Sequence, residues 1–232
     1  MFLEIKDVCK HYGEGESRQQ VLDQVNLTVE RGEFCVLLGP SGSGKSTLLN
    51  IVGGIDFADS GYVSIDGSKT EDMNERALTE YRRTHLGYVF QQYNLIGNLT
   101  VRENIETGAY LSKSPLDIDE LLDTLGLAAH QDKLPNQLSG GQQQRTSIGR
   151  AIVKNPDILL CDEPTGALDY ATSKDILQLI ERVNEKYGNT IMMVTHNEAI
   201  AHMADRVVKL RDGKILENKV NDAKTPAAQL EW

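Results

Sequence analysis

Residues 34–46 read Phe-Cys-Val-Leu-Leu-Gly-Pro-Ser-Gly-Ser-Gly-Lys-Ser, and they give the strongest indication of the fold. The apolar run at 34–38 predicts a buried strand, and residues 47–52 predict the helix that follows. Between them, residues 39–46 match the phosphate-loop pattern G-x-x-x-x-G-K-[ST] in the strand–loop–helix setting that it requires. A glycine-rich structural turn would explain the glycines, but not a Gly-Lys-Ser-Thr string after a buried strand. The stretch therefore predicts an α/β core that binds a nucleotide.

The chemistry of the phosphate loop assigns a role to each of its polar groups. Its glycines let successive backbone N–H groups point at an anion, and the following helix adds the positive end of its dipole. We expect Lys45 to reach the outer phosphates as a catalytic charge, Ser46 to offer its hydroxyl to Mg²⁺, and Thr47 to contact the inner phosphates. The predicted nucleotide-binding residues of this loop are Gly39, Ser41, Gly42, Ser43, Gly44, Lys45, Ser46 and Thr47.

An apolar run at 158–161 ends in two acidic residues, Asp162 and Glu163. Adjacent side chains leave a strand in different directions, so the two carboxylates can take different roles. We expect Asp162 to hold Mg²⁺ and Glu163 to accept a proton from the attacking water. An acidic pair at a strand end is often only a solvated turn. Because a phosphate loop follows an earlier strand, the acidic pair and the loop together predict one nucleotide-binding site.

Residues 138–145, Leu-Ser-Gly-Gly-Gln-Gln-Gln-Arg, form a second candidate phosphate-binding segment. Ser139 and Gln142 fit a capping box at a helix start, while Gly140 and Gly141 leave backbone donors open to an anion. A plain helix cap is the alternative for Ser139 taken alone. One nucleotide has a single γ-phosphate, yet the chain offers it two helix N-termini. A head-to-tail homodimer resolves this, with each nucleotide held between the phosphate loop of one subunit and the Ser139 segment of the other.

The composition is that of an ordinary soluble protein: of 232 residues, 40% are hydrophobic and 25% charged, and the mean hydropathy is −0.36. No apolar run reaches the roughly 18 residues needed to span a bilayer, and the N-terminus has no signal-peptide pattern, so we expect a cytoplasmic chain. The three cysteines have no C-x-x-C spacing and are expected to be reduced. The net charge of −10 argues against a nucleic-acid partner, which would need a concentrated basic surface.

The order of apolar patterns predicts one domain over residues 1–232, with an insertion. Residues 1–90 and 156–217 predict an α/β core of the P-loop NTPase (RecA-like) type, with an N-terminal antiparallel β subdomain. Residues 91–155 predict an inserted helical subdomain, in which Thr100 caps one helix and Gly126 ends another. Residues 218–232 are predicted to form a C-terminal tail.

Taken in order, these motifs resemble those of the ATP-binding subunit of an ABC transporter. The resemblance covers about residues 2–217, and its most specific element is Leu-Ser-Gly-Gly-Gln at 138–142. It implies ATP and Mg²⁺ as the ligands and ATP hydrolysis as the reaction. The motifs that carry it lie at 39–46, 91, 138–142, 162–165, 167–169 and 196.

The resemblance also implies roles for four further residues. Gln91 would contact Mg²⁺ and the attacking water, and His196 would touch the γ-phosphate, which makes both catalytic candidates. Asp169 would lie at the dimer seam, and a helix N-cap is its second reading. Tyr12 would stack on adenine. The alternatives are a surface tyrosine for Tyr12 and, for Gln91, one surface glutamine of the pair with Gln92.

Residues 53–56, 82–95, 99–104 and 142–145 resemble the macrolide-export and lipoprotein-release branch of this family. That branch implies an ATPase dimer that drives separate integral membrane permease subunits. The chain would then lie on the inner face of the cell membrane, without a span of its own, and support export or mechanical transmission of a peptide, lipoprotein or drug. Gly97 stands where a proline is common, in the stretch expected to face the membrane subunit.

A second function stays open at this point. A nucleotide-gated regulatory or scaffold module of a cell-division or peptide-sensing membrane complex would use the same ATP site, with shape change as its output and nothing exported. The chain does not specify a cargo or a direction, because specificity would reside in the membrane subunits.

Overall fold

A six-stranded sheet forms the centre of the computed structural model, which describes residues 1–232 apart from the side chain of Glu16. In the order β10-β9-β3-β8-β7-β6, the last five strands pair in parallel and β10 is antiparallel to β9. Every residue of β3 and β8 is buried, as expected for parallel strands that are covered on both faces. The strands span Phe34–Leu38 (β3), Leu86–Val89 (β6), Ile158–Asp162 (β7), Thr190–Thr195 (β8), Arg206–Arg211 (β9) and Lys214–Val220 (β10).

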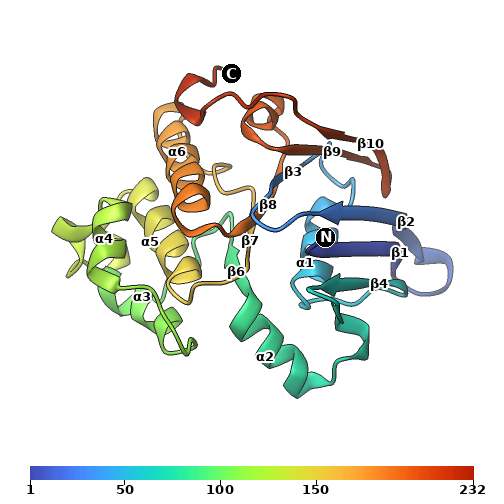
Figure 1. Cartoon of the computed structure of the whole chain (residues 1–232), viewed down its shortest axis with the longest axis horizontal. Coiled ribbons are helices and arrows are strands. Elements are labelled where there is room, and N and C mark those ends of the chain that lie inside the picture. The colour runs from blue at the N-terminus through green and yellow to red at the C-terminus, as the bar shows by residue number, and fades with distance from the viewer.

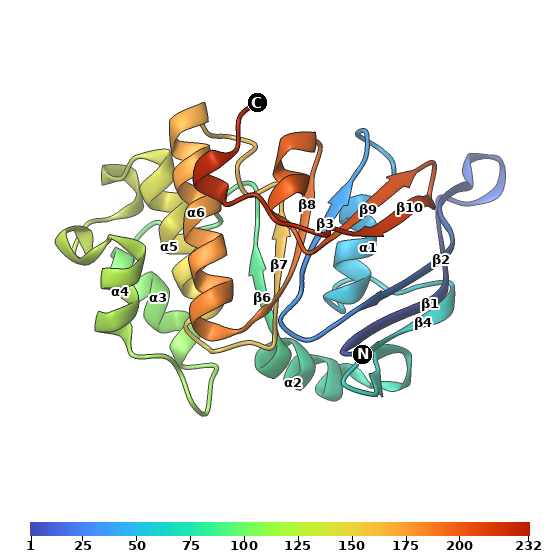
Figure 2. The same ribbon diagram turned by 45° about the horizontal axis from the view of Figure 1, so that its top comes forward.

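The N-terminal strands form a separate antiparallel sheet in the order β2-β1-β4-β5. It lies at one end of the molecule, as Figures 1 and 2 show. The apolar alternation in the first thirty residues predicted this arrangement, and the predicted turn at Asp66 and Gly67 is present, with positive φ at both residues. The strands span Leu3–Tyr12 (β1), Gln19–Val29 (β2), Ser60–Ile65 (β4) and Ser68–Lys69 (β5).

The α-helices divide into two groups. α1 and α2 lie toward the antiparallel sheet, and α3, α4 and α5 gather at the far end of the molecule beside α6 (Figure 1). Thr100 caps α3 through a full capping box and Gly126 ends α4 in the left-handed conformation, as the sequence predicted. The predicted α/β class is confirmed. The helices span Lys45–Val52 (α1), Glu75–His85 (α2), Val101–Ala109 (α3), Ile118–Leu125 (α4), Gly140–Ile152 (α5) and Tyr170–Tyr187 (α6).

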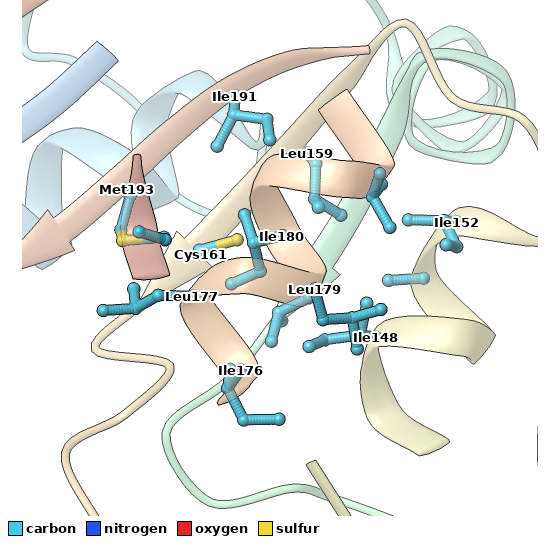
Figure 3. Packing of buried hydrophobic residues seen from close by; sticks show 14 of the residues in the cluster. Ile148, Ile152, Leu159, Cys161, Ile176, Leu177, Leu179, Ile180, Ile191 and Met193 are labelled. Carbon is cyan, nitrogen blue, oxygen red and sulfur yellow. The ribbon is translucent and has the colours of Figure 1, made fainter. Parts of the chain in front are cut away.

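Two apolar cores occupy the two faces of the six-stranded sheet, because side chains alternate along each strand. On one face Val36 and Cys161 belong to a core shared with α5 and α6, and Figure 3 shows Ile148 of α5 and Ile180 of α6 in that cluster. On the other face Cys35 belongs to a core shared with α1 and the antiparallel sheet. The helix after the phosphate loop and the helix after Ser139 therefore lie on opposite faces of the sheet.

The C-terminal residues return to α6. The backbone N–H of Ala227 donates to the carboxylate of Glu181, at 3.2 Å from either oxygen, and Leu230 is buried. Because β10 continues to Val220, residues 218–220 belong to the sheet and not to the predicted tail. Among the described residues, no helix has both the length and the apolar character to cross a membrane.

Candidate nucleotide-binding site

The phosphate loop connects β3 to α1 and is packed tightly against neighbouring backbone. A Cβ at Gly39 would lie 2.1 Å from the carbonyl oxygen of Leu210 in β9, so no larger residue fits there without moving β9. Gly44, the N-cap of α1, has φ 98° and offers no side-chain cap. The first backbone N–H groups of α1 are therefore free to bind an anion.

The loop encloses one side of an open pocket of about 360 Å³. Ser43 is almost fully buried there, and its Oγ has no hydrogen-bond partner among the residues that the structure describes. The pocket wall contains every predicted phosphate-loop residue except Gly39, together with Tyr12, and two residues of β2 and Glu163 complete it. Its lining residues are Tyr12, Gln19, Val21, Ser41, Gly42, Ser43, Gly44, Lys45, Ser46, Thr47 and Glu163.

Lys45 occupies the centre of the loop. Its Nζ donates to the carbonyl oxygens of Gly39 and Pro40 at 2.8 Å each, and the residue is 5% exposed. Burial lowers the pKa of Lys45, although the charges of Glu163 and Asp162 oppose the shift. A buried ammonium that is held by carbonyl groups alone carries positive charge that an anionic ligand can neutralise.

Ser46 and Asp162 approach each other across the sheet edge. The Ser46 hydroxyl donates to Oδ1 of Asp162 at 2.9 Å. Burial raises the pKa of Asp162, and the nearby Glu163 charge adds to this, against the Ser46 hydrogen bond and Lys45. Two oxygen donors that converge on one point suit Mg²⁺, which takes few protein ligands and completes its shell with phosphate oxygens and water. The described residues contain no group of three or more His, Cys, Asp or Glu side chains able to hold a metal by themselves.

Glu163 follows Asp162 with an unusual backbone. Its φ is 45°, in the left-handed region that disfavours larger residues, and its N–H donates to the Val194 carbonyl at 3.0 Å. This turn separates the directions of the two adjacent carboxylates. Oε2 of Glu163 lies 3.1 Å from Nδ1 of His196, whose side chain is 65% exposed. The predicted base and the histidine that is expected to touch the γ-phosphate are thus in contact.

Gln91 reaches the same place from the end of β6. A Cβ built at Gly166 would lie 2.8 Å from Nε2 of Gln91 and 3.2 Å from Oε2 of Glu163, so both side chains converge on that glycine. Three of the four predicted catalytic residues therefore form one group: the Gln91 amide, the Glu163 carboxylate and the His196 imidazole lie around the end of β7. The fourth, Lys45, lines the phosphate-loop pocket together with Glu163.

The Ser139 segment lies elsewhere. Ser139 Oγ accepts from the Gln142 N–H at 3.3 Å, and Gln142 Oε1 accepts from the Ser139 N–H at 3.0 Å, so the predicted capping box is formed. None of residues 139–142 lines the phosphate-loop pocket. α5 and α1 lie on opposite sides of the sheet strands in Figure 2. The two helix starts that the sequence predicts to bind anions are therefore separated within one chain.

Asp169 is tied to the Ser139 segment and not to the phosphate loop. It caps α6 by accepting from the N–H of Thr172 at 3.0 Å and from its hydroxyl at 2.7 Å. A Cβ built at Gly141 would lie 2.5 Å from Cγ2 of Thr172. The N-cap reading of Asp169 is therefore correct in this chain, and Thr172 joins the cap to the start of α5.

Sequence reasoning missed the residues around Tyr12. The Tyr12 ring lines the pocket and is 44% exposed, while its hydroxyl donates to Oδ2 of Asp56 at 2.5 Å. Lys10 binds the same carboxylate at 2.6 Å. The signal available was the period of two in a strand, which puts Lys10 and Tyr12 on one face of β1. Asp56 lies 44 residues from Tyr12 and gave no such signal.

Comparison with known proteins identifies the class. The family model for ABC transporters matches residues 22–166 of the chain. The chain belongs to this family as an ATP-binding, ATP-hydrolysing domain.

Individual relatives resemble nearly the whole chain. It is 46% identical to a putative ABC transporter ATP-binding protein, MG065 homolog, of Mycoplasma pneumoniae, over 99% of this chain and 50% of that protein. It is 42% identical to the macrolide export ATP-binding/permease protein MacB of Neisseria gonorrhoeae, over 98% of this chain and 36% of that protein. The chain thus spans half or less of the length of these relatives.

The solved structures give the same result for the fold. The dimeric post-hydrolysis state of the ATP-binding cassette MJ0796, bound to ADP and Pi, is 41% identical, with a TM-score of 0.85 over 94% of this chain and 98% of that one. The cassette cbiO1 of the cbiONQ transporter complex from Clostridium perfringens is 29% identical, with a TM-score of 0.84 over 94% of this chain and 88% of that one.

Proposed function

We propose that this chain forms a head-to-tail homodimer around two MgATP molecules and drives membrane subunits of the macrolide-export and lipoprotein-release type. One observation carries the proposal: the two helix starts that are predicted to bind phosphate lie on opposite faces of one sheet, so a single chain cannot close both on one nucleotide. The dimeric state of the 41%-identical cassette supports it. Each bound ATP then bridges the two subunits, and its hydrolysis removes the bridge.

The chemistry follows from the described contacts. Lys45 and the N–H groups at the start of α1 would bind the β- and γ-phosphates, and Ser46 and Asp162 would hold Mg²⁺. Bound Mg²⁺ would supply charge neutralisation at the phosphates. Glu163, in contact with His196, would take the proton of the attacking water.

The second helix start would be supplied by the partner subunit in this dimer. The N–H groups of Gly140 and Gly141 have no intrahelical partner, and Ser139 keeps its hydroxyl proton because Oγ serves the cap only as an acceptor. These donors would reach the γ-phosphate only in the closed dimer. Hydrolysis would remove that contact and open the dimer.

Glu163→Gln tests the proposed base. We expect ATP binding to remain, hydrolysis to fall by about 10²-fold or more, and the closed dimer to accumulate with ATP in size-exclusion chromatography. Glu185→Gln, an exposed glutamate on the same chain, is the matched control and keeps normal turnover. Near-normal hydrolysis by Glu163→Gln would remove Glu163 as the base.

Mixing two inactive variants tests the shared site. Lys45→Met disables the phosphate loop, and Gly141→Asp places a carboxylate where the γ-phosphate of the partner's nucleotide would lie. In a head-to-tail dimer, the mixed pair contains one site in which both halves are intact. We expect the mixture to hydrolyse ATP faster than either variant alone. If the mixture is as inactive as its components, each chain uses its own Ser139 segment or none.

The membrane partner needs a separate test. We expect permease subunits to co-purify with the chain from native membranes, with the cassette on the cytoplasmic face. Reconstitution with that partner then separates transport from the regulatory module: ATP-dependent extrusion of a cargo supports transport, and ATP-dependent signalling without extrusion supports the module. Recovery without any integral membrane protein would contradict both. Because the relatives are longer, the native polypeptide mass should be measured in the same preparation.

A further inference from the structure

The loop between α1 and β4 is bound closely to the end of β1. The N–H of Asp59 donates to the Cys9 carbonyl at 2.9 Å, and the N–H of His11 donates to Oδ2 of Asp59 at 2.7 Å. Nδ1 of His11 lies 3.0 Å from the same oxygen. These contacts fix residues 56–59 against the strand that carries Tyr12.

Asp56 is at the centre of this junction. Its Oδ1 accepts from Nζ of Lys10 at 2.6 Å and from the N–H of Phe57 at 2.7 Å, and its Oδ2 accepts from the Tyr12 hydroxyl at 2.5 Å. Nζ of Lys10 also donates to the Phe57 carbonyl at 2.7 Å. Lys10 is buried, so its ammonium depends on these partners.

The charges of this junction are well defined. Burial works against ionisation of Asp56, but hydrogen bonds from Lys10, Tyr12 and the Phe57 N–H outweigh it and lower the pKa of the carboxyl group. The Tyr12 hydroxyl therefore donates to a charged acceptor, which makes a short and strong hydrogen bond. Nζ of Lys10 also lies 5.0 Å from the centroid of the Tyr12 ring.

We propose that Lys10 and Asp56 are positioning residues that hold the Tyr12 ring in place at the nucleotide pocket, so that the base contributes to ATP affinity. The inference rests on the proposed binding of MgATP and on the expectation, implied by the family resemblance, that Tyr12 stacks on adenine. A ring that is fixed before binding loses little conformational freedom when a base stacks on it, whereas a free surface tyrosine must be ordered at the moment of binding. The triphosphate does not depend on this ring, because its proposed contacts come from the phosphate loop, from Mg²⁺ held with Asp162, and from the Ser139 segment of the partner subunit.

The experiment compares two probes, MgATP and magnesium tripolyphosphate, by measuring Kd for each. Tyr12→Phe removes only the tether and leaves Lys10 paired with Asp56, so the variant should fold. We expect its ATP affinity to fall by about 5-fold, with the tripolyphosphate affinity unchanged. The double variant Lys10→Met with Asp56→Asn removes both charges together. Its ATP affinity should fall by about 10-fold, and its tripolyphosphate affinity should not change. Asp59→Asn is the matched control in the same loop: it keeps its backbone bond to Cys9 and an amide oxygen that accepts from the His11 N–H, so ATP affinity should not change.

A double-mutant cycle separates positioning from general loop damage. In a Tyr12→Ala background, the Lys10→Met and Asp56→Asn pair should cause no further loss of ATP affinity, because there is no ring left to position. An equal loss in both backgrounds, or an equal loss for both probes, would overturn the positioning role. So would a Tyr12→Phe variant with the ATP affinity of the unmodified protein.

The same measurements keep this inference distinct from the proposed function. If Tyr12→Ala itself leaves ATP affinity unchanged, Tyr12 does not contact the base, and the expected adenine contact fails while the proposed ATPase function stands. If Tyr12→Ala weakens ATP binding while the other variants do not, only the positioning role of Lys10 and Asp56 fails.

Discussion

Two helices of this chain begin with glycine-rich turns, and their N-termini are built in opposite ways. α1 starts after Gly44, whose left-handed backbone carries no side-chain cap. α5 starts after Ser139, whose side chain and that of Gln142 close a full capping box. The first helix start leaves its N–H groups to a ligand or to water, whereas the second satisfies part of its own N–H groups.

This difference suits two different tasks. An uncapped helix start beside a buried lysine and two carboxylates has strong, unbalanced charges and gains most from a bound anion with its metal. A capped start is stable without a ligand and offers a γ-phosphate only a few remaining donors. We therefore expect the α1 region to set nucleotide affinity, and the α5 region to set how tightly a second subunit closes.

The largest effect should come from the α1 region. Lys45→Met should weaken ATP binding and lower hydrolysis by at least about 10²-fold, because one preorganised donor at a phosphate is typically worth about 3 kcal/mol. Isothermal titration and phosphate release measure the two quantities. Lys154→Met is the matched control, since Nζ of Lys154 also donates to a backbone carbonyl, that of Arg82 at 2.8 Å, away from the phosphate loop. An equal loss of ATP affinity in both variants would mean that removing any buried or half-buried lysine weakens ATP binding, and that the position of Lys45 in the phosphate loop has no special role.

A smaller and different effect is expected at the α5 region. Ser139→Ala should cost about 1 kcal/mol of stability through the lost cap and should also weaken ATP-dependent dimerisation, while the monomer binds ATP as before. Thr100→Ala removes the cap of α3, which has the same capping box, and should cost similar stability without changing dimerisation. Chemical denaturation and analytical ultracentrifugation separate the two quantities. Equal dimerisation constants for both variants would reduce Ser139 to a plain helix cap.

The sequence predicts those parts of each region in which the interacting residues are close together in the chain. The phosphate loop and the Ser139 capping box were predictable because strand, turn and helix lie within a few residues, and the cap uses side chains three apart. The Asp162 and Glu163 pair could be placed at a strand end for the same reason. These are contacts that short-range geometry determines.

The contacts between segments were not predictable in this way. The tether from Tyr12 to Asp56 depends on how the loop after α1 packs on β1, which follows from the pairing of β1 with β4 over a long separation in sequence. The approach of Thr172 to Gly141 depends on the packing of α6 on α5. Neither leaves a pattern in the sequence of one segment.

The smallest expected effect is on the pH dependence of stability, which should differ in sign between Asp162 in the α1 region and Asp169 beside the α5 region. Burial raises the pKa of Asp162 above 3.8, so the folded protein binds this proton more tightly than the unfolded chain does. Stability from this group is therefore lost as the pH rises from about 3.8 through the raised value. Asp162→Asn removes the buried charge and should raise the Tm of the nucleotide-free protein by roughly 2 °C at neutral pH, while Mg²⁺-dependent hydrolysis is lost.

For Asp169, the pKa shift and its effect on stability have the opposite sign. Hydrogen bonds from the N–H and hydroxyl of Thr172 lower its pKa, so its stabilising contribution is present above 3.8 and is lost as the pH falls through the lowered value. Asp169→Asn should therefore lower Tm slightly at neutral pH, with the difference vanishing in acid. Thermal unfolding of both variants between pH 3 and 8 checks the signs. A lower Tm for Asp162→Asn at neutral pH would show that Ser46 and Lys45 already stabilise the ionised Asp162 carboxylate. The α1 region would then hold no unbalanced carboxylate charge, and its proposed contrast with the α5 region would be wrong for Asp162.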